Sequence, residues 1–244
     1  MKLKTLPSNS INLPKPLSLK PQKSSRSVFL RSEIDRLLFL SVCFSCLLVV
    51  IRMIHTGRNT FLFLVWNIFL AWLPYLITGQ LARMTPFRPR LLFAGLMLAW
   101  LLFIPNSFYI ITDLYHLNDW YNDRQMPSWF DLAMILSFVW NGLLLGVLSV
   151  RQMEKILKPR LPAHHELFFL YPVMWLNAVG VYTGRYLRFN SWNLITDPFQ
   201  LFGDMARLVI HPLRNQYVWA MIFCFSILMT LMYLMMKRIS KALN

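Results

Sequence analysis

The segment Ile104–Leu117 combines apolar residues with polar side chains that are suited to acid–base chemistry. Its polar residues follow one another at intervals of three or four positions: Asn106, Tyr109, Asp113 and His116. On a helix, this spacing places all of them on one face. Aspartate and histidine are common general bases, and an ionisable group inside an apolar segment nearly always faces a protein interior or a wet cavity. This face is therefore the first candidate for a functional site.

Pro105 lies inside the same segment and affects its backbone. A proline within a helix removes one hydrogen bond and crowds the carbonyl group four residues earlier, here that of Leu101. We therefore expect the helix to kink or to end at this point, and Asn106 to supply a hydrogen bond to the freed backbone. This structural role accounts for Asn106 but leaves Asp113 and His116 unexplained.

Three further charged side chains stand at the ends of later apolar segments: Asp131, Arg185 and Arg188. Asp131 falls in the first turn of its helix, where the helix dipole favours a carboxylate as a cap. Three roles are open to the two arginines. They pair with Asp113 and Asp131, they bind a phosphate or carboxylate of a ligand, or they extend toward lipid headgroups.

The overall composition is unlike that of a soluble domain. Of the 244 residues, 57% are apolar and 14% are charged, whereas soluble domains have about 25% charged residues. Six apolar segments each approach the ~20 residues that a helix needs to cross a membrane. They are residues 37–54, 61–78, 91–112, 129–150, 167–187 and 217–236. The predicted fold is therefore all-α, a polytopic transmembrane helical bundle.

The net charge of +15 is explained by orientation in the membrane. If the N-terminus is cytoplasmic, most of the 25 Lys and Arg residues fall in cytoplasmic segments, as the positive-inside rule requires. An even number of spans then places both termini in the cytoplasm. The expected partners of the basic segments are anionic membrane lipids, and nucleic-acid binding is not expected.

The chain divides into a tail and one transmembrane domain. Residues 1–30 are rich in Lys, Ser and Pro and lack the apolar core of an export signal, so we expect a disordered basic cytoplasmic tail. Residues 31–244 form the predicted domain. In its last outer loop, Pro198 follows the expected N-cap Asp197, and the residues that follow have the pattern of a short interfacial helix. That helix would anchor the loop or cover the polar site.

No cofactor or metal site is predicted. The three cysteines all lie within apolar segments, which excludes a disulfide framework. His164, His165 and Glu166 are adjacent in a cytoplasmic loop, but they lack the spacing of metal ligands. The sequence also contains no phosphate-binding loop, dinucleotide fingerprint or nucleophile elbow.

Small and amide side chains mark the fourth and fifth spans. Each span has one pair of glycines four residues apart, in Gly142-x-x-x-Gly146 and Gly180-x-x-x-Gly184. Such pairs let helices approach closely, so we expect these two spans to contact each other and the glycine faces to be able to support an oligomer. Asn141 and Asn177 lie near mid-membrane, and we expect them to hydrogen-bond to each other or to the backbone.

The motifs PNSFYIITDLYHL, PSWFD and GRYLRFNSWN resemble those of a bacterial membrane-protein family, the domain of unknown function 1361. The resemblance runs from about Leu37 to Met236, with Ser107 as a departure where a residue such as alanine is expected. It carries over these positions: Pro105, Asn106, Tyr109, Thr112, Asp113, Trp129, Asp131, Gly184, Arg185, Arg188, Asn190, Ser191 and Trp192. It implies a protein of the bacterial plasma (inner) membrane and offers no assigned activity.

The preferred hypothesis is a membrane protein with a polar Asp/His/Arg site near the outer leaflet, which binds or processes an anionic or lipid-linked ligand. The candidate catalytic residues are Asp113, His116 and Asp131. The candidate ligand-binding residues are Asn106, Tyr109, Asp113, Arg185, Arg188, Asn190 and Trp192. Two alternatives are a transporter of a small solute, although few polar residues reach the middle of the membrane, and a structural or assembly subunit of a membrane complex.

Overall fold

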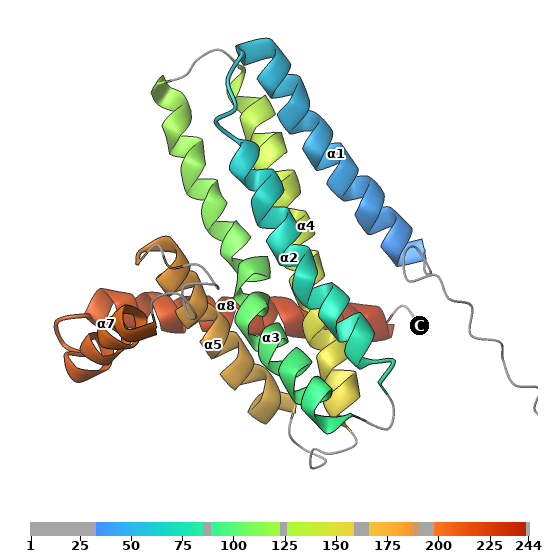
Figure 1. Ribbon diagram of the computed structural model, residues 1–244. Coiled ribbons are helices and arrows are strands. Elements are labelled where there is room, and N and C mark those ends of the chain that lie inside the picture. The colour runs from blue at the N-terminus through green and yellow to red at the C-terminus, as the bar shows by residue number, and fades with distance from the viewer. Residues whose placement is uncertain are drawn as a thin grey trace, which may run out of the picture.

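In the part of the chain that the computed structural model describes, all regular secondary structure is helical. This part comprises residues 33–84, 89–122, 126–158, 166–187, 189 and 198–242, so the predicted tail lies outside it. Its elements carry the labels of Figure 1: α1 (Glu33–Thr56), α2 (Leu62–Leu81), α3 (Arg90–Tyr109), the 3-10 helix η1 (Ile110–Asn122), α4 (Ser128–Leu157), α5 (Glu166–Arg185), α7 (Pro198–Ile210) and α8 (Gln216–Ala242). Six helical segments in this part are long and apolar enough to cross a membrane. The predicted all-α transmembrane bundle is confirmed.

Helix α4 is the centre of the bundle. In its most apolar stretch 67% of the residues are buried within the protein, whereas the other five spans bury 28–33%. Helices α1, α2 and α3 pack around α4, α5 packs on α3, and α8 packs on α5. Figure 1 shows α8 running obliquely across the other spans, with α7 near its first turns. The polar groups described below therefore lie between helices and not on the outer, apolar faces.

The third span continues through its proline. Helix α3 contains Pro105 and ends only at Tyr109, after which the chain carries on as the 3-10 helix η1. Asn106 Nδ2 donates to the carbonyl oxygen of Phe103 at 3.0 Å, so it does supply a hydrogen bond to the backbone beside the proline. A 3-10 helix has three residues per turn, and it brings side chains three positions apart directly into line.

The two glycine pairs pack against the third span, so the predicted close approach of the fourth and fifth spans at these glycines is wrong. A Cβ atom on Gly142 would lie 2.5 Å from Ile110 Cγ2, and one on Gly146 would lie 3.0 Å from Ser107. A Cβ atom on Gly180 would lie 2.5 Å from Pro105 Cβ. A Cβ atom on Gly184 would lie 3.2 Å from the ring of Tyr109. Because α3 and η1 cover both pairs, an oligomer of this chain would need another surface.

The mid-membrane asparagines do not bond to each other. Asn141 Nδ2 on α4 donates to the Ser45 hydroxyl oxygen on α1 at 3.0 Å. Asn177 Nδ2 on α5 lies 3.9 Å from the sulfur atom of Met174, within its own helix. Each asparagine is completely buried. The hydrogen bond from the Asn141 amide to Ser45 therefore links the central helix α4 to α1.

The short helix predicted in the last loop is present as α7. It begins at Pro198, and its expected cap Asp197 lies outside the described residues, as do His164 and His165. The indole Nε1 atom of Trp219 in α8 donates to the carbonyl oxygen of Leu208 at 3.3 Å. This hydrogen bond fixes α7 beside the start of α8.

Candidate functional site

The centre of the candidate site is the carboxylate of Asp113. The residue is 1% exposed, although η1 places it close to the end of a span. Asn67 Nδ2 on α2 donates to its Oδ2 atom at 2.9 Å. Within the described residues, its Oδ1 atom has no hydrogen-bond partner. A buried polar group without a partner is costly, so such an atom marks a place where a further group would be stabilising.

His116 and Arg185 lie next to this carboxylate. The two side chains are in contact, with Arg185 Nη1 3.1 Å from His116 Nε2. Both residues act electrostatically on Asp113. The 3-10 geometry explains why Asp113 and His116, three positions apart, reach the same cluster.

Aromatic rings enclose the cluster. The His116 ring centroid lies 4.8 Å from that of Phe63 on α2. The guanidinium carbon of Arg185 lies 5.4 Å from the centroid of Tyr115. Tyr186 lies just beyond the fifth span, next to Tyr115. Burial, and to a smaller extent the neighbouring Tyr115, raises the pKa of the Tyr186 hydroxyl. We use the name polar cluster for Asn67, Asp113, His116 and Arg185.

A cavity of about 430 Å³ adjoins the polar cluster; we call it the α3–α5 cavity. Its walls come from α2, α3, α5 and α7 and are mainly apolar, with Leu98 and Leu101 among them. Asn67 lines the cavity and also donates to Asp113, so it is the one residue of the polar cluster that the two features share. The polar side chains along its wall are Asn67, Asn106, Tyr109 and Thr183. Met205 of α7 also lines it, so α7 helps to enclose the space.

Asp131 belongs to a different interaction from the predicted one. Its Oδ1 atom lies 2.7 Å from Nε of Arg52, and its Oδ2 atom lies 3.3 Å from Nη2 of the same residue. Arg52 comes from α1 and also lies over the ring of Phe61, at 4.3 Å from the ring centroid. Asp131 is therefore the anion of a buried two-point ion pair, and the expected pairing with Arg185 is not observed.

Two residues of these interactions were missed by the sequence reasoning. Arg52 and Asn67 both fall inside predicted apolar spans, where charged and amide side chains are expensive. The same rule that singled out Asp113 therefore pointed to them as well. Three predicted ligand-binding residues, Arg188, Asn190 and Trp192, lie outside the described residues.

Within the described residues, no group of three or more His, Cys, Asp or Glu side chains is placed to hold a metal ion. The polar cluster instead offers an arginine, an imidazole, an amide and a carboxylate. Arginine donates in a planar, two-point geometry that suits phosphate and carboxylate groups. The chemistry that the cluster can perform is recognition of an anionic group and proton transfer at Asp113 or His116.

No curated protein and no solved structure matches the chain. One family does match it, over residues 66–232, and its description is protein of unknown function (DUF1361). The matched region includes the whole polar cluster and excludes α1, so it begins later than the resemblance that started near Leu37. It covers more than half of the chain. The protein therefore belongs to the family of proteins of unknown function DUF1361.

Proposed function

We propose that the protein binds an amphiphile with an anionic group, such as a lipid-linked phosphate or carboxylate. The anionic group would be held by Arg185, and the apolar chain would lie in the α3–α5 cavity. The observation that carries the proposal is a half-buried arginine that directly follows Gly184, a residue in the wall of the apolar cavity. A binding pocket of this kind joins a largely apolar wall to a few placed polar groups.

The charge of Arg185 supports this proposal. Its described contacts are His116 Nε2 and the ring of Tyr115. Among the described residues, no carboxylate forms an ion pair with Arg185, and Asp131 pairs with Arg52. Several of the five guanidinium donors thus remain for a ligand. A phosphate or carboxylate accepts two of them in parallel.

The size and walls of the cavity support an apolar chain as the other half of the ligand. A volume of about 430 Å³ lies within the 300–1,000 Å³ that is usual for small-molecule sites. Residues Leu98, Leu102 and Leu176 line it, whereas a site for a free polar solute would need more donors and acceptors. Asp113 and His116 are the two candidate groups for proton transfer if the bound molecule is also processed.

The same proposal includes the placement in the membrane. We place the polar cluster toward the outer leaflet of a bacterial plasma membrane, with both termini in the cytoplasm. The support for this orientation is the bias of Lys and Arg toward the segments on the side of the termini. The ligand would then reach the cavity from the outer leaflet.

Binding of dodecyl phosphate, which has one alkyl chain and one phosphate, tests the proposal. The full-length protein in a neutral detergent is titrated by calorimetry, alongside Arg185→Gln and Leu98→Trp. Loss of a charge-assisted contact is expected to weaken binding about tenfold or more in Arg185→Gln. The tryptophan at position 98 occupies part of the cavity and is expected to weaken binding as well.

Two matched variants serve as controls. Arg207→Gln removes an arginine on α7 whose side chain is 81% exposed. Leu92→Trp introduces the same ring on the exposed face of α3, away from the cavity. Both are expected to bind as the wild type does. Equal affinities for the wild type and Arg185→Gln, or an equal loss in Arg207→Gln, would overturn the proposal.

A further inference from the structure

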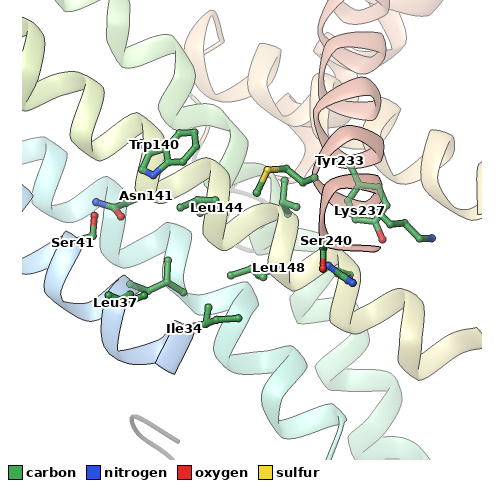
Figure 2. Close-up of a pocket in the computed structure, with 14 residues that line it drawn as sticks. Ile34, Leu37, Ser41, Trp140, Asn141, Leu144, Leu148, Tyr233, Lys237 and Ser240 are labelled. Carbon is green, nitrogen blue, oxygen red and sulfur yellow. The ribbon is translucent and has the colours of Figure 1, made fainter. Parts of the chain in front are cut away.

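A second cavity lies between α1, α4 and α8; we call it the α1–α8 cavity. Its volume is about 520 Å³, and it shares no lining residue with the α3–α5 cavity. Figure 2 shows Leu37 from α1, Leu144 and Leu148 from α4, and Tyr233 from α8 around this space. Its walls are mainly apolar. It is thus independent of the polar cluster and of the function proposed for it.

The cavity extends over about half of the membrane. Arg151 and Asn141, both on α4, line it and are ten residues apart. At 1.5 Å per residue this separation is about 15 Å, which is half of the ~30 Å thickness of the hydrocarbon core. Asn141 closes the deeper end, because its hydrogen bond to Ser45 ties α4 to α1. The length of the cavity therefore corresponds to the thickness of one lipid leaflet.

The volume of the cavity, about 520 Å³, suits a small ligand such as a lipid chain. It lies in the range of 300–1,000 Å³ that is usual for small ligands.

The charge at the shallow end determines which lipid fits. Lys237 lines the cavity there, and its Nζ atom forms an ion pair with Oε1 of Glu154 at 2.5 Å. Arg151 also lines the cavity, and no carboxylate among the described residues lies within ion-pair distance of it. The net charge at this end is therefore positive. Basic pockets between membrane helices are suited to anionic headgroups.

We propose that the α1–α8 cavity binds an anionic glycerophospholipid. One acyl chain lies along Leu144 and Leu148, and the phosphate contacts Arg151. The lipid fills the space between α1 and α8 and joins the two ends of the chain to the central helix. The site depends on Arg151, whereas the proposed function depends on Arg185, so each is testable without the other.

The test measures phospholipid retained by the purified full-length protein. The protein is reconstituted in vesicles of equal parts phosphatidylglycerol and phosphatidylcholine, extracted in a neutral detergent, and its bound lipid is quantified by mass spectrometry. The wild type is expected to retain phosphatidylglycerol preferentially. Arg151→Gln is expected to reduce that retention about tenfold, the effect of losing a hydrogen bond to a charged group. Leu148→Trp, which fills the cavity, is expected to reduce retention of both lipids.

Matched controls separate this site from the surface and from the other cavity. Arg238→Gln removes an exposed arginine of α8 that does not line the cavity, and Leu136→Trp places the ring on the exposed face of α4. Both controls are expected to retain lipid as the wild type does. Equal retention in Arg151→Gln and the wild type would overturn the inference. So would a loss confined to Arg185→Gln, because the retained lipid would then belong to the α3–α5 cavity.

A photo-crosslinking residue at position 144 identifies the occupant directly. We expect it to capture phospholipid in native membranes, because Leu144 lines the cavity. Capture of a protein chain in place of lipid would mean that a partner helix occupies the groove, and the inference would be wrong.

Discussion

The Nε atom of Arg52 lies 2.7 Å from Oδ1 of Asp131, and each side chain is 2% exposed. The two residues are 79 positions apart in the chain and come from α1 and α4. Burial of two charges is stabilising only when both are well paired, and removal of one partner leaves the other uncompensated. This ion pair therefore holds the first span on the central helix.

Asp131→Asn is expected to destabilise the protein strongly. Leaving a buried arginine without its partner costs about 3–5 kcal/mol. The free energy of unfolding is measured by denaturant titration in detergent. The double variant Arg52→Met/Asp131→Leu, which removes both charges, is expected to lie closer to the wild type.

The exposed pair of Arg207 and Asp204 is the control for this experiment. Its atoms are 3.6 Å apart, and the arginine side chain is 81% exposed. Asp204→Asn is expected to change the free energy of unfolding by less than about 1 kcal/mol. If Asp131→Asn has no greater effect than Asp204→Asn, the ion pair on α4 does not hold α1 in place.

Gly180→Ala is expected to loosen the contact between α5 and α3. The added Cβ atom would lie 2.5 Å from Cβ and 2.7 Å from Cγ of Pro105, and a proline ring cannot rotate away. Such overpacking costs about 1–3 kcal/mol of unfolding free energy. Gly203→Ala on α7 is the control, because its Cβ atom would meet nothing within 4 Å. It is expected to be neutral or slightly stabilising, and equal effects of the two variants would contradict the packing described.

The hydrogen bond between Asn67 and Asp113 is expected to appear as an energetic coupling. Asn67→Leu removes the described partner of the buried Asp113 carboxylate, a loss of about 1–3 kcal/mol. Asp113→Leu also removes the group that needs the partner. In a double-mutant cycle, the double variant should therefore be less destabilised than the sum of the single variants. Strict additivity would show that the two side chains do not interact.

The proposed orientation is testable with single cysteines. Cys43, Cys46 and Cys224 are first replaced by serine, and a cysteine is then placed at Asn59 or at Arg83, both exposed beyond the ends of α2. A membrane-impermeant maleimide is expected to label position 59 in intact cells and position 83 only after lysis. The opposite pattern would invert the proposed topology.

The sequence was sufficient to predict the spans and part of the polar cluster. Hydrophobic runs of about 20 residues identify membrane helices because backbone groups in lipid must bond within their own segment. Asp113 and His116 were found because a charged side chain is conspicuous in an apolar segment. Arg185 was found at the end of its span, and the structure places it against His116.

The pairing of helices could not be predicted in the same way. A pair of glycines indicates a close approach but does not identify the neighbour, and Gly180 meets Pro105 of α3 where a contact with α4 was expected. An arginine likewise does not show which of several carboxylates it will reach. Asp131 pairs with Arg52 of α1, whereas Arg185 was the expected partner. These choices depend on three-dimensional packing, which local patterns do not contain.

The limits of the family match do not coincide with those of the folding unit. Arg52 precedes residue 66, yet it neutralises Asp131 within the matched region. At the other end, Tyr233 and Lys237 follow residue 232, yet both bond to the carboxylate of Glu154. A fragment trimmed to the matched residues would leave the carboxylates of Asp131 and Glu154 without these partners. The flanking helices thus supply the counterions Arg52 and Lys237 in addition to anchoring the chain. An expression fragment must therefore include both helices.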